Sequence, residues 1–299
     1  MQFRKTIVAD SVAVAASSVT TFDLPVNPIS FLTLTMRFLN VTDEATLSQV
    51  LLKLANIQVT RFGQAIFNMS GTDLQKLNMV LQRNNPILAN QVATDNAARY
   101  ISLRIPFSRL PLDPNEGIGA TLRGELKCQI TISASEADAD NCAIQLEATE
   151  MLGASPKKYL KITTASITPV SGIDNDLALP IGNDYAGLFI FSTTVPTSTS
   201  FTTSAAKMKY LLDNVETDLI SSNWESLHGD LLARVGHREE YDASADNDDI
   251  ANYAFVDFSP NNEDTWLVST KGHSQSTFRF TAGDANIVRC MPIELVANS

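Results

Sequence analysis

The chain has 299 residues and a net charge of −11; 44% of its residues are hydrophobic and only 18% are charged. This length and apolar content are enough for two buried cores. The acidic balance argues against a broad phosphate-binding face, no apolar run is long enough to predict a transmembrane helix, and the first residues lack the pattern of a signal peptide.

Residues 1–18 are rich in Val, Ala and Ser and have no helical period, so we interpret them as an extended N-terminal arm. Because such an arm lies outside the core, we expect its deletion to spare the fold and weaken assembly. The next expected elements are a strand at Thr20–Asp23, a turn at Pro25–Pro28, an alternating strand at Phe31–Phe38, a segment at Thr46–Leu54 that fits helix or strand, and a hairpin about Gly63.

A helix is predicted next, because Thr72 and Gln75 have the spacing of a capping box and Leu77 and Leu81 follow at helical spacing. The first half then continues with strands at Tyr100–Phe107, Glu125–Ala134 and Ala143–Glu150. The second half has strands at Leu188–Phe191, Tyr253–Phe258, Thr265–Thr270, Thr277–Thr281 and Ile287–Val296, a loop or edge strand at Val195–Ala206 and a capped helix at Ser222–Arg234. About sixteen short strands and two helices predict sandwiches or barrels.

The two halves of the chain share three landmarks in the same order. Leu24-Pro25 and Leu179-Pro180 each precede an apolar strand, and the two prolines lie 155 residues apart. The capped helices follow at an offset of 150, and the strands that contain Tyr100 and Tyr253 follow at an offset of 153. The nearly constant offset indicates two similar domains of about half the chain each.

Residue types that carry chemistry are present but do not form a known catalytic or metal motif. His228, His237 and His273 lack the spacing of metal ligands, so we expect surface or capping roles. The Asp242, Asp246, Asp248 and Asp249 cluster fails the EF-hand pattern, which favours a solvated loop over a calcium site. Asp113 and Glu116 are expected to face water, and Trp224 is expected in a core. No catalytic, cofactor-binding or metal-ligating residue is therefore assigned.

The three cysteines are too few and too scattered for a disulfide framework. Cys128 and Cys142 flank an expected turn, so their pairing stays an alternative to buried free thiols, which the pattern favours; Cys290 lies far from both in sequence.

Two tandem β domains, in each of which the expected first barrel strand follows a Leu-Pro pair and one helix is inserted at the same point, resemble the double jelly roll major capsid proteins of the tectivirus, corticovirus and adenovirus lineage. The resemblance implies an all-β fold of two tandem antiparallel eight-stranded jelly rolls, each with one inserted helix. It divides the chain into an arm at residues 1–18, a first jelly roll at 19–168 and a second at 169–299. The small proteins of tailless, membrane-containing icosahedral phages are the nearest in plan.

The resemblance also implies a function without catalysis. Three copies of the chain form a homotrimer with six similar jelly rolls, and these pseudo-hexamers tile an icosahedral virion shell. Implied partners are further copies of the chain, vertex or penton and minor capsid proteins, and an internal lipid membrane reached by the N-terminal arm through Arg4 and Lys5. Sequence-specific binding of nucleic acid is not expected, and the implied location is the virion, after assembly in the host cytoplasm.

Three alternatives remain open on the sequence alone. A phage tail, baseplate or fibre protein would also be β-rich and acidic. A carbohydrate-binding protein of two β-sandwiches would require exposed aromatic residues, yet aromatics are only 7% of the chain. An enzyme of the cupin type would require clustered histidines on barrel strands.

Overall fold

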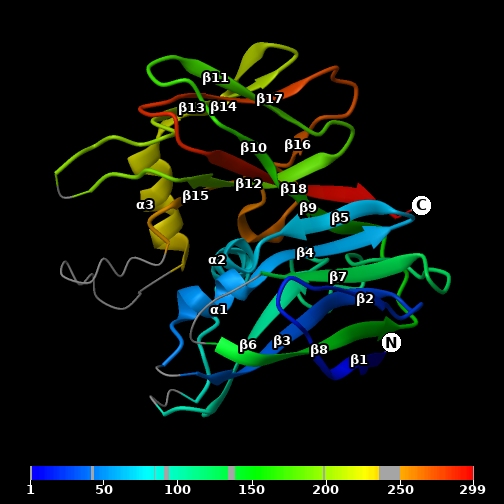
Figure 1. Cartoon of the computed structure of the whole chain (residues 1–299). Coiled ribbons are helices and arrows are strands. Elements are labelled where there is room, and N and C mark those ends of the chain that lie inside the picture. Colours follow the sequence, from blue (N-terminus) through cyan, green and yellow to red (C-terminus); the bar gives the residue numbers. More distant parts are fainter. Residues whose placement is uncertain are drawn as a thin grey trace. The chain divides into compact units, whose positions relative to one another are not determined.

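The structure is a computed structural model that describes residues 2–41, 44–83, 85–90, 94–133, 139–197, 199–235 and 250–298. The chain divides into two units (Figure 1). Unit 1 comprises Met1–Lys161 together with Val296–Ser299, and unit 2 comprises Ile162–Leu295. The boundary between residues 168 and 169 that the sequence predicts lies seven residues further along the chain.

Unit 1 consists of two antiparallel sheets and two helices. Its strands are β1 (Gln2–Ala13), β2 (Val19–Asp23), β3 (Ile29–Asn40), β4 (Leu54–Arg61), β5 (Gln64–Met69), β6 (Ala98–Pro106), β7 (Leu126–Ile132) and β8 (Ala139–Leu152). Its helices are α1 (Leu47–Lys53) and α2 (Gly71–Gln82), and β9 (Lys158–Thr163) leads into unit 2. One sheet has the order β1-β8-β3-β6, and the other contains β5-β4-β7-β2 in that order (Figure 1).

The strand order of unit 1 is that of a jelly roll. The first strand pairs with the eighth, the second with the seventh, the third with the sixth and the fourth with the fifth, always antiparallel. This nesting arises when a long hairpin of strands rolls up into two sheets that face each other across one core. Buried Leu34, Met36, Ile101 and Ile144 from β3, β6 and β8 lie on the core side of the first sheet.

Unit 2 repeats this order with its own strands. They are β10 (Ala165–Ile167), β11 (Asp174–Leu179), β12 (Asp184–Ser192), β13 (Lys207–Leu212), β14 (Val215–Asn223), β15 (Tyr253–Asp257), β16 (Val268–Ser269), β17 (Ser276–Thr281) and β18 (Val288–Ala297), with helix α3 (Trp224–Val235) and the short 3₁₀ helix η1 (Pro260–Asn262). The sheets are β15-β12-β18-β10 and β11-β17-β13-β14, and β16 adds a short pairing to β12.

The internal duplication predicted from the sequence is present in this topology. The two Leu-Pro pairs precede β3 and β12, the helices α2 and α3 each connect the fifth sheet position to the sixth, and the strands of Tyr100 and Tyr253 are β6 and β15. The predicted fold class, all-β with two tandem jelly rolls, is therefore confirmed. Unit 1 has α1 in addition, over the segment that fitted helix or strand: a capped helix ends at Lys53 and β4 begins at once.

The expected N-terminal arm has a different place in the structure. Residues Gln2–Ala13 form β1, which pairs with β8 from Gln2 opposite Leu152 to Ala13 opposite Ala143. The strand is largely exposed because it lies at the edge of its sheet and is interrupted by two register shifts. The segment rich in Val and Ala without a helical period is therefore the first strand of the jelly roll.

The predicted helices form, but both predicted capping boxes are wrong. Helix α2 begins at Gly71, and Ser70 is its N-cap, with its Oγ accepting from the Asp73 backbone N–H at 3.1 Å. Helix α3 begins at Trp224, while Ser222 still belongs to β14. A true capping box occurs at α1, where Thr46 and Gln49 bond to each other's backbone.

A glycine at the start of α2 is required by close packing. An added Cβ at Gly71 would lie 2.6 Å from the Leu54 Cβ and 2.7 Å from the Leu51 carbonyl oxygen. These distances are shorter than van der Waals contact, so any larger residue would push α2 away from the end of α1.

At the expected hairpin Gly63 has φ +78°, the left-handed conformation that glycine adopts without strain.

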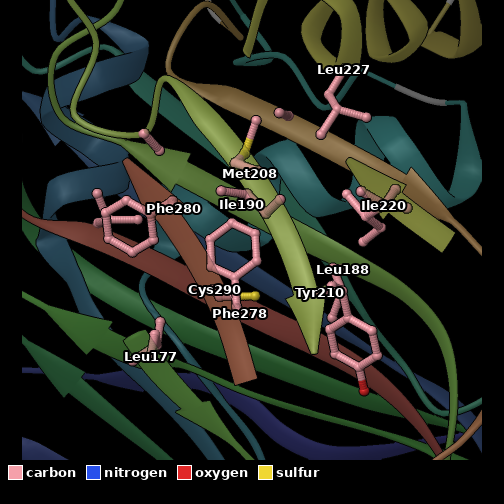
Figure 2. Close-up of a cluster of buried hydrophobic side chains, with 14 of the residues drawn as sticks. Leu177, Leu188, Ile190, Met208, Tyr210, Ile220, Leu227, Phe278, Phe280 and Cys290 are labelled. Atoms are coloured by element: carbon pink, nitrogen blue, oxygen red, sulfur yellow. The ribbon is translucent and has the colours of Figure 1, made fainter. Parts of the chain in front are cut away.

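The core of unit 2 lies between its two sheets and extends under α3. Leu188 and Ile190 of β12 and Phe278 and Phe280 of β17 belong to the same cluster of buried side chains (Figure 2). Trp224 of α3 belongs to the same cluster and is 1% exposed, as predicted. No helix in the described ranges is both long and apolar enough to cross a membrane.

Candidate assembly surfaces

The described histidines have local structural partners. His228 Nδ1 lies 2.8 Å from the Tyr253 carbonyl oxygen, and its ring stacks on Trp224. His273 Nδ1 lies 2.8 Å from Asp213 Oδ2 at the surface. Within the described ranges, no group of three or more His, Cys, Asp or Glu residues is placed to hold a metal ion. His237 and the Asp242, Asp246, Asp248 and Asp249 cluster lie outside the described residues.

The cysteines are free thiols in buried positions. Burial raises the pKa of Cys128 to about 12 and raises that of Cys290 further. Cys128 and Cys142 do not form a disulfide, so the alternative left open by the sequence is wrong. The unpaired thiols stay protonated at neutral pH.

The expectation that Glu116 faces water is wrong. Glu116 is 2% exposed and accepts hydrogen bonds from the Arg109 guanidinium, whose Nε lies 3.0 Å from Oε1. Lys158 Nζ lies 3.5 Å from the same carboxylate. Pairing of this buried acid with two cations holds the Pro-rich loop against unit 1. The role of the cluster of Glu116, Arg109 and Lys158 is therefore structural. Asp113 accepts from the Asn115 backbone N–H within the loop.

A buried glutamate fastens the turn after each Leu-Pro pair to the last strand of its unit. In unit 1, Asn27 Nδ2 donates to Glu150 Oε2 at 2.5 Å, just before β3 begins. Arg4 and Thr6 of β1 donate to the same fully buried carboxylate, and Arg4 Nη2 lies 2.9 Å from Oε2.

Unit 2 repeats this contact with Asn183 and Glu294. Asn183 Nδ2 donates to Glu294 Oε2 at 2.7 Å, directly before β12, and Glu294 is fully buried on β18. The duplication therefore extends to a matching hydrogen bond. The sequence carries the signal, an Asn after each Leu-Pro pair and a Glu near the end of each unit's last strand, but only the fold brings them together.

The contacts of Glu150 set its protonation. Burial alone would raise its pKa, but hydrogen bonds from Arg4, Thr6 and Asn27, together with the charge of Arg4, outweigh burial and lower the pKa below the usual carboxylate value.

Asn298 belongs to unit 1, and its side chain bonds to two loops and to strand β4 of that unit. Its Nδ2 donates to the carbonyl oxygens of Gly117 and Pro156, both at 2.9 Å. Its Oδ1 accepts from the Gly119 backbone N–H at 3.0 Å and from Arg61 at 3.1 Å. One side chain thus uses its full hydrogen-bonding capacity to hold the loops around β9.

The side of the β1-β8-β3-β6 sheet that faces away from the core forms what we call the outer sheet face. The strand register places on it Lys5, Ile7, Thr33, Thr35, Arg37, Tyr100, Ser102, Arg104, Gln145 and Glu147. It is polar with isolated exposed apolar residues, and it holds a hollow of about 420 Å³ lined by residues that include Arg37, Tyr100 and Gln145. This sheet side is an extended surface that is open to contacts.

Two jelly rolls in one chain, with the same strand order and a helix at the same connection, define a double jelly roll protein. Its structural neighbours are viral capsid proteins. The major capsid protein of Sulfolobus turreted icosahedral virus matches with a TM-score of 0.72 at 12% identity, over 99% of this chain and 97% of that chain. The major capsid protein P2 of bacteriophage PM2 matches with a TM-score of 0.66 at 11% identity, over 100% and 98% of the two chains.

A chain of the PBCV-1 virus capsid matches with a TM-score of 0.61 at 8% identity, over 100% of this chain and 95% of that chain. No family profile matches the sequence, and no curated protein matches it either. The chain therefore has the fold of the double jelly roll major capsid proteins, as the sequence layout predicted, without recognisable sequence similarity to them.

Proposed function

We propose that this chain is a major capsid protein that builds the shell of an icosahedral virion. The observation that carries the proposal is the match of the whole chain, both jelly rolls included, to nearly the whole length of viral major capsid proteins. A match confined to one domain would suit a modular tail or carbohydrate-binding protein equally well. The proposed role is structural, with no enzymatic activity.

The proposed assembly unit is a homotrimer. A closed ring of three chains contains six similar jelly rolls, and a ring of six similar faces can pack in a flat hexagonal array. The duplicated strand order supports this pseudo-hexamer, because each unit offers nearly the same set of strands to its neighbours. Such trimers would tile the facets of the shell.

The proposal extends to further partners. Vertex or penton proteins and minor capsid proteins would close the shell where trimers alone cannot. An internal lipid membrane, contacted near the N-terminus of the chain, would belong to a tailless phage of the kind the sequence layout resembles. The proposed location is the virion, after assembly in the host cytoplasm.

Light scattering and negative-stain microscopy of the purified protein test this proposal. We expect a mass three times the 32.5 kDa of one chain, and flat particles with hexagonal outlines. A monomer at every concentration that the protein tolerates would contradict it, as would elongated fibres.

A further inference from the structure

Arg61, the last residue of β4, is a buried cation without an anionic partner. It is 7% exposed and shares the inward face of β4 with the buried Ile57 and Val59. Among the residues that the structure describes, Arg61 has no ion pair, and its Nε is buried without a hydrogen-bond partner. A buried charge left unpaired is costly, so we expect this arginine to bind an anion that the described residues do not supply.

The groups that contact Arg61 are neutral. Its Nη1 donates to Asn298 Oδ1 at 3.1 Å, and its guanidinium carbon lies 5.5 Å from the ring centroids of both Phe62 and Tyr159. These contacts fix the guanidinium at the end of unit 1, beside the hairpin between β4 and β5 (Figure 1). They bring no negative charge to it.

A second unused hydroxyl lies in the neighbouring turn. Gly119 donates its backbone N–H to the same Asn298 oxygen as Arg61 does, so this turn lies next to the arginine. Two residues further on, Thr121 Oγ1 is buried and has no hydrogen-bond partner. An arginine and a hydroxyl that both lack a partner are suited to a ligand with several acceptor oxygens.

The acidic residues of this end do not neutralise its cations. The turns here carry six Lys or Arg against four Asp or Glu, counted over residues 23–28, 61–64, 107–127 and 152–158. The balance is therefore +2 in a chain with a net charge of −11. Each of the four acids already has a partner within unit 1, and they are Asp23, Asp113, Glu116 and Glu125. Arg123 and Lys157 are exposed and have no ion pair among the described residues.

The same turns present exposed apolar side chains. Phe62 is 62% exposed, Leu122 is 72% exposed and Val26 is 43% exposed. The three turns are bonded to one another, because the Phe62 N–H donates to the Glu125 carbonyl at 3.0 Å and the Thr121 N–H donates to the Val26 carbonyl at 2.9 Å. Apolar side chains beside unpaired cations are typical of surfaces that bind the headgroup region of a bilayer.

We propose that Arg61 is the centre of a binding site for the phosphate group of an anionic phospholipid. The inference rests on the proposed function, in which the shell encloses a membrane, and it names the group that is bound and the residue that binds it. A guanidinium can donate two parallel hydrogen bonds to phosphate oxygens. Phe62 is the exposed side chain in contact with the guanidinium, so its rotation opens the site, and its ring then lies among the lipids with Leu122.

Vesicle binding by the full-length chain tests the proposal. Sedimentation with vesicles of phosphatidylglycerol and phosphatidylcholine, and of phosphatidylcholine alone, measures the affinity. Arg61→Met removes the buried charge, and Arg37→Gln removes one charge from an exposed position on the outer sheet face as the control. We expect Arg61→Met to bind the anionic vesicles at least about tenfold more weakly than the wild type. Arg37→Gln should bind them like the wild type.

Inorganic phosphate measures the site without a membrane. Compared with chloride at the same ionic strength, it should raise the melting temperature of the wild type but not of Arg61→Met, because an anion that binds only the folded chain stabilises it. Phe62→Ser should keep this response and bind vesicles more weakly. If phosphate and chloride act alike on the wild type, Arg61 does not bind an anion, whether or not the variant folds.

The remaining outcomes separate the lipid from a free anion, and this inference from the proposed function. If phosphate stabilises the wild type but Arg61→Met and Arg37→Gln bind vesicles alike, the lipid assignment is wrong. If the wild type forms trimers that bind no anionic vesicles, the inference fails while the proposed function stands. A chain that stays monomeric and binds anionic vesicles through Arg61 would give the opposite result.

Discussion

Glu150 and Glu294 occupy equivalent positions in the last strands of the two units, and each accepts a hydrogen bond from an asparagine that precedes the third strand. A fully buried carboxylate is costly unless its oxygens are satisfied. In unit 1 Arg4 and Thr6 complete this satisfaction and tie β1 to the same residue. A single side chain therefore connects the first strand, the last strand and the turn before β3.

Replacing Glu150 by Gln should lower the free energy of unfolding by about 2 kcal/mol, because hydrogen bonds to a charged acceptor are worth about 1.5–3 kcal/mol. Urea denaturation followed by circular dichroism measures this. Glu147→Gln, on the opposite face of the same strand, is the matched control and should stay within about 0.5 kcal/mol of the wild type. Equal stability of the two variants would contradict the assigned role of Glu150.

Glu150 should also contribute to acid sensitivity. Since its folded-state pKa is lowered, its stabilising contribution is complete above the unfolded pKa of about 4.3 and is lost as the pH falls towards the lowered folded value. Between pH 5 and pH 2 the wild type should therefore lose more stability than Glu150→Gln. Urea midpoints measured across this range would test the sign, and parallel curves for the two proteins would contradict it.

At the scale of elements, the sequence predicted the strands and helices that have strong periodicity. Alternation identified β3, β6, β7 and β8, and Leu spacing identified α2 and α3. The helix starts were predicted wrongly because Thr72 and Ser222 each precede a Gln or Glu by three positions, as the first residue of a capping box does. In the structure Ser70 is the N-cap of α2, and β14 continues to Asn223. The buried pairing of Glu116 was missed because Lys158 is distant in sequence and because the sequence does not reveal that the loop turns Glu116 back onto Arg109, seven residues before it.

The helices α2 and α3 should both contribute to the stability of their unit. Leu77 is fully buried and Leu227 is 8% exposed, so Leu77→Ala and Leu227→Ala should each cost about 2–5 kcal/mol. Leu232→Ala in α3, at a 38% exposed position, serves as the control and should have little effect. Thermal melts that do not separate Leu227→Ala from Leu232→Ala would refute the packing of α3.

Because Gln2–Ala13 form strand β1, deleting these residues should damage the fold of unit 1, contrary to the expectation from the sequence. Removing Gln2–Ala13 would expose the edge of β8 and leave Glu150 without Arg4, so the truncated chain should aggregate or lose the cooperative unfolding of unit 1. Phe3→Ser keeps the backbone pairing and should melt like the wild type. A truncated chain with an unchanged melt would restore the interpretation of a separate arm.

At the scale of the whole molecule, the composition gave a net charge of −11 but not its distribution. Division of the chain at Lys161 gives unit 2 a net charge of −12 and unit 1 a net charge of +1. The boundary between residues 168 and 169 that the sequence predicts gives the same division, because residues 162–168 carry no charged side chain. Self-repulsion at this level destabilises a folded unit at low salt.

Salt should therefore stabilise unit 2. Both tryptophans, Trp224 and Trp266, lie in unit 2, and Trp224 is in its core. Tryptophan fluorescence thus reports the unfolding of this unit alone. Raising the ionic strength from about 0.01 M to about 0.15 M shortens the screening length from about 30 Å to about 8 Å and should raise the melting temperature seen by fluorescence. An unchanged or lower value would contradict this prediction.

The contacts of Asn298 have a consequence for the order of events during protein synthesis. Unit 1 is translated first, yet its loops at Gly117, Gly119 and Pro156 share hydrogen bonds with a residue that is translated after unit 2. The unit that emerges first is therefore completed last. A nascent chain therefore lacks these bonds in unit 1 until unit 2 has been translated, so unit 1 completes its loops only when both jelly rolls exist.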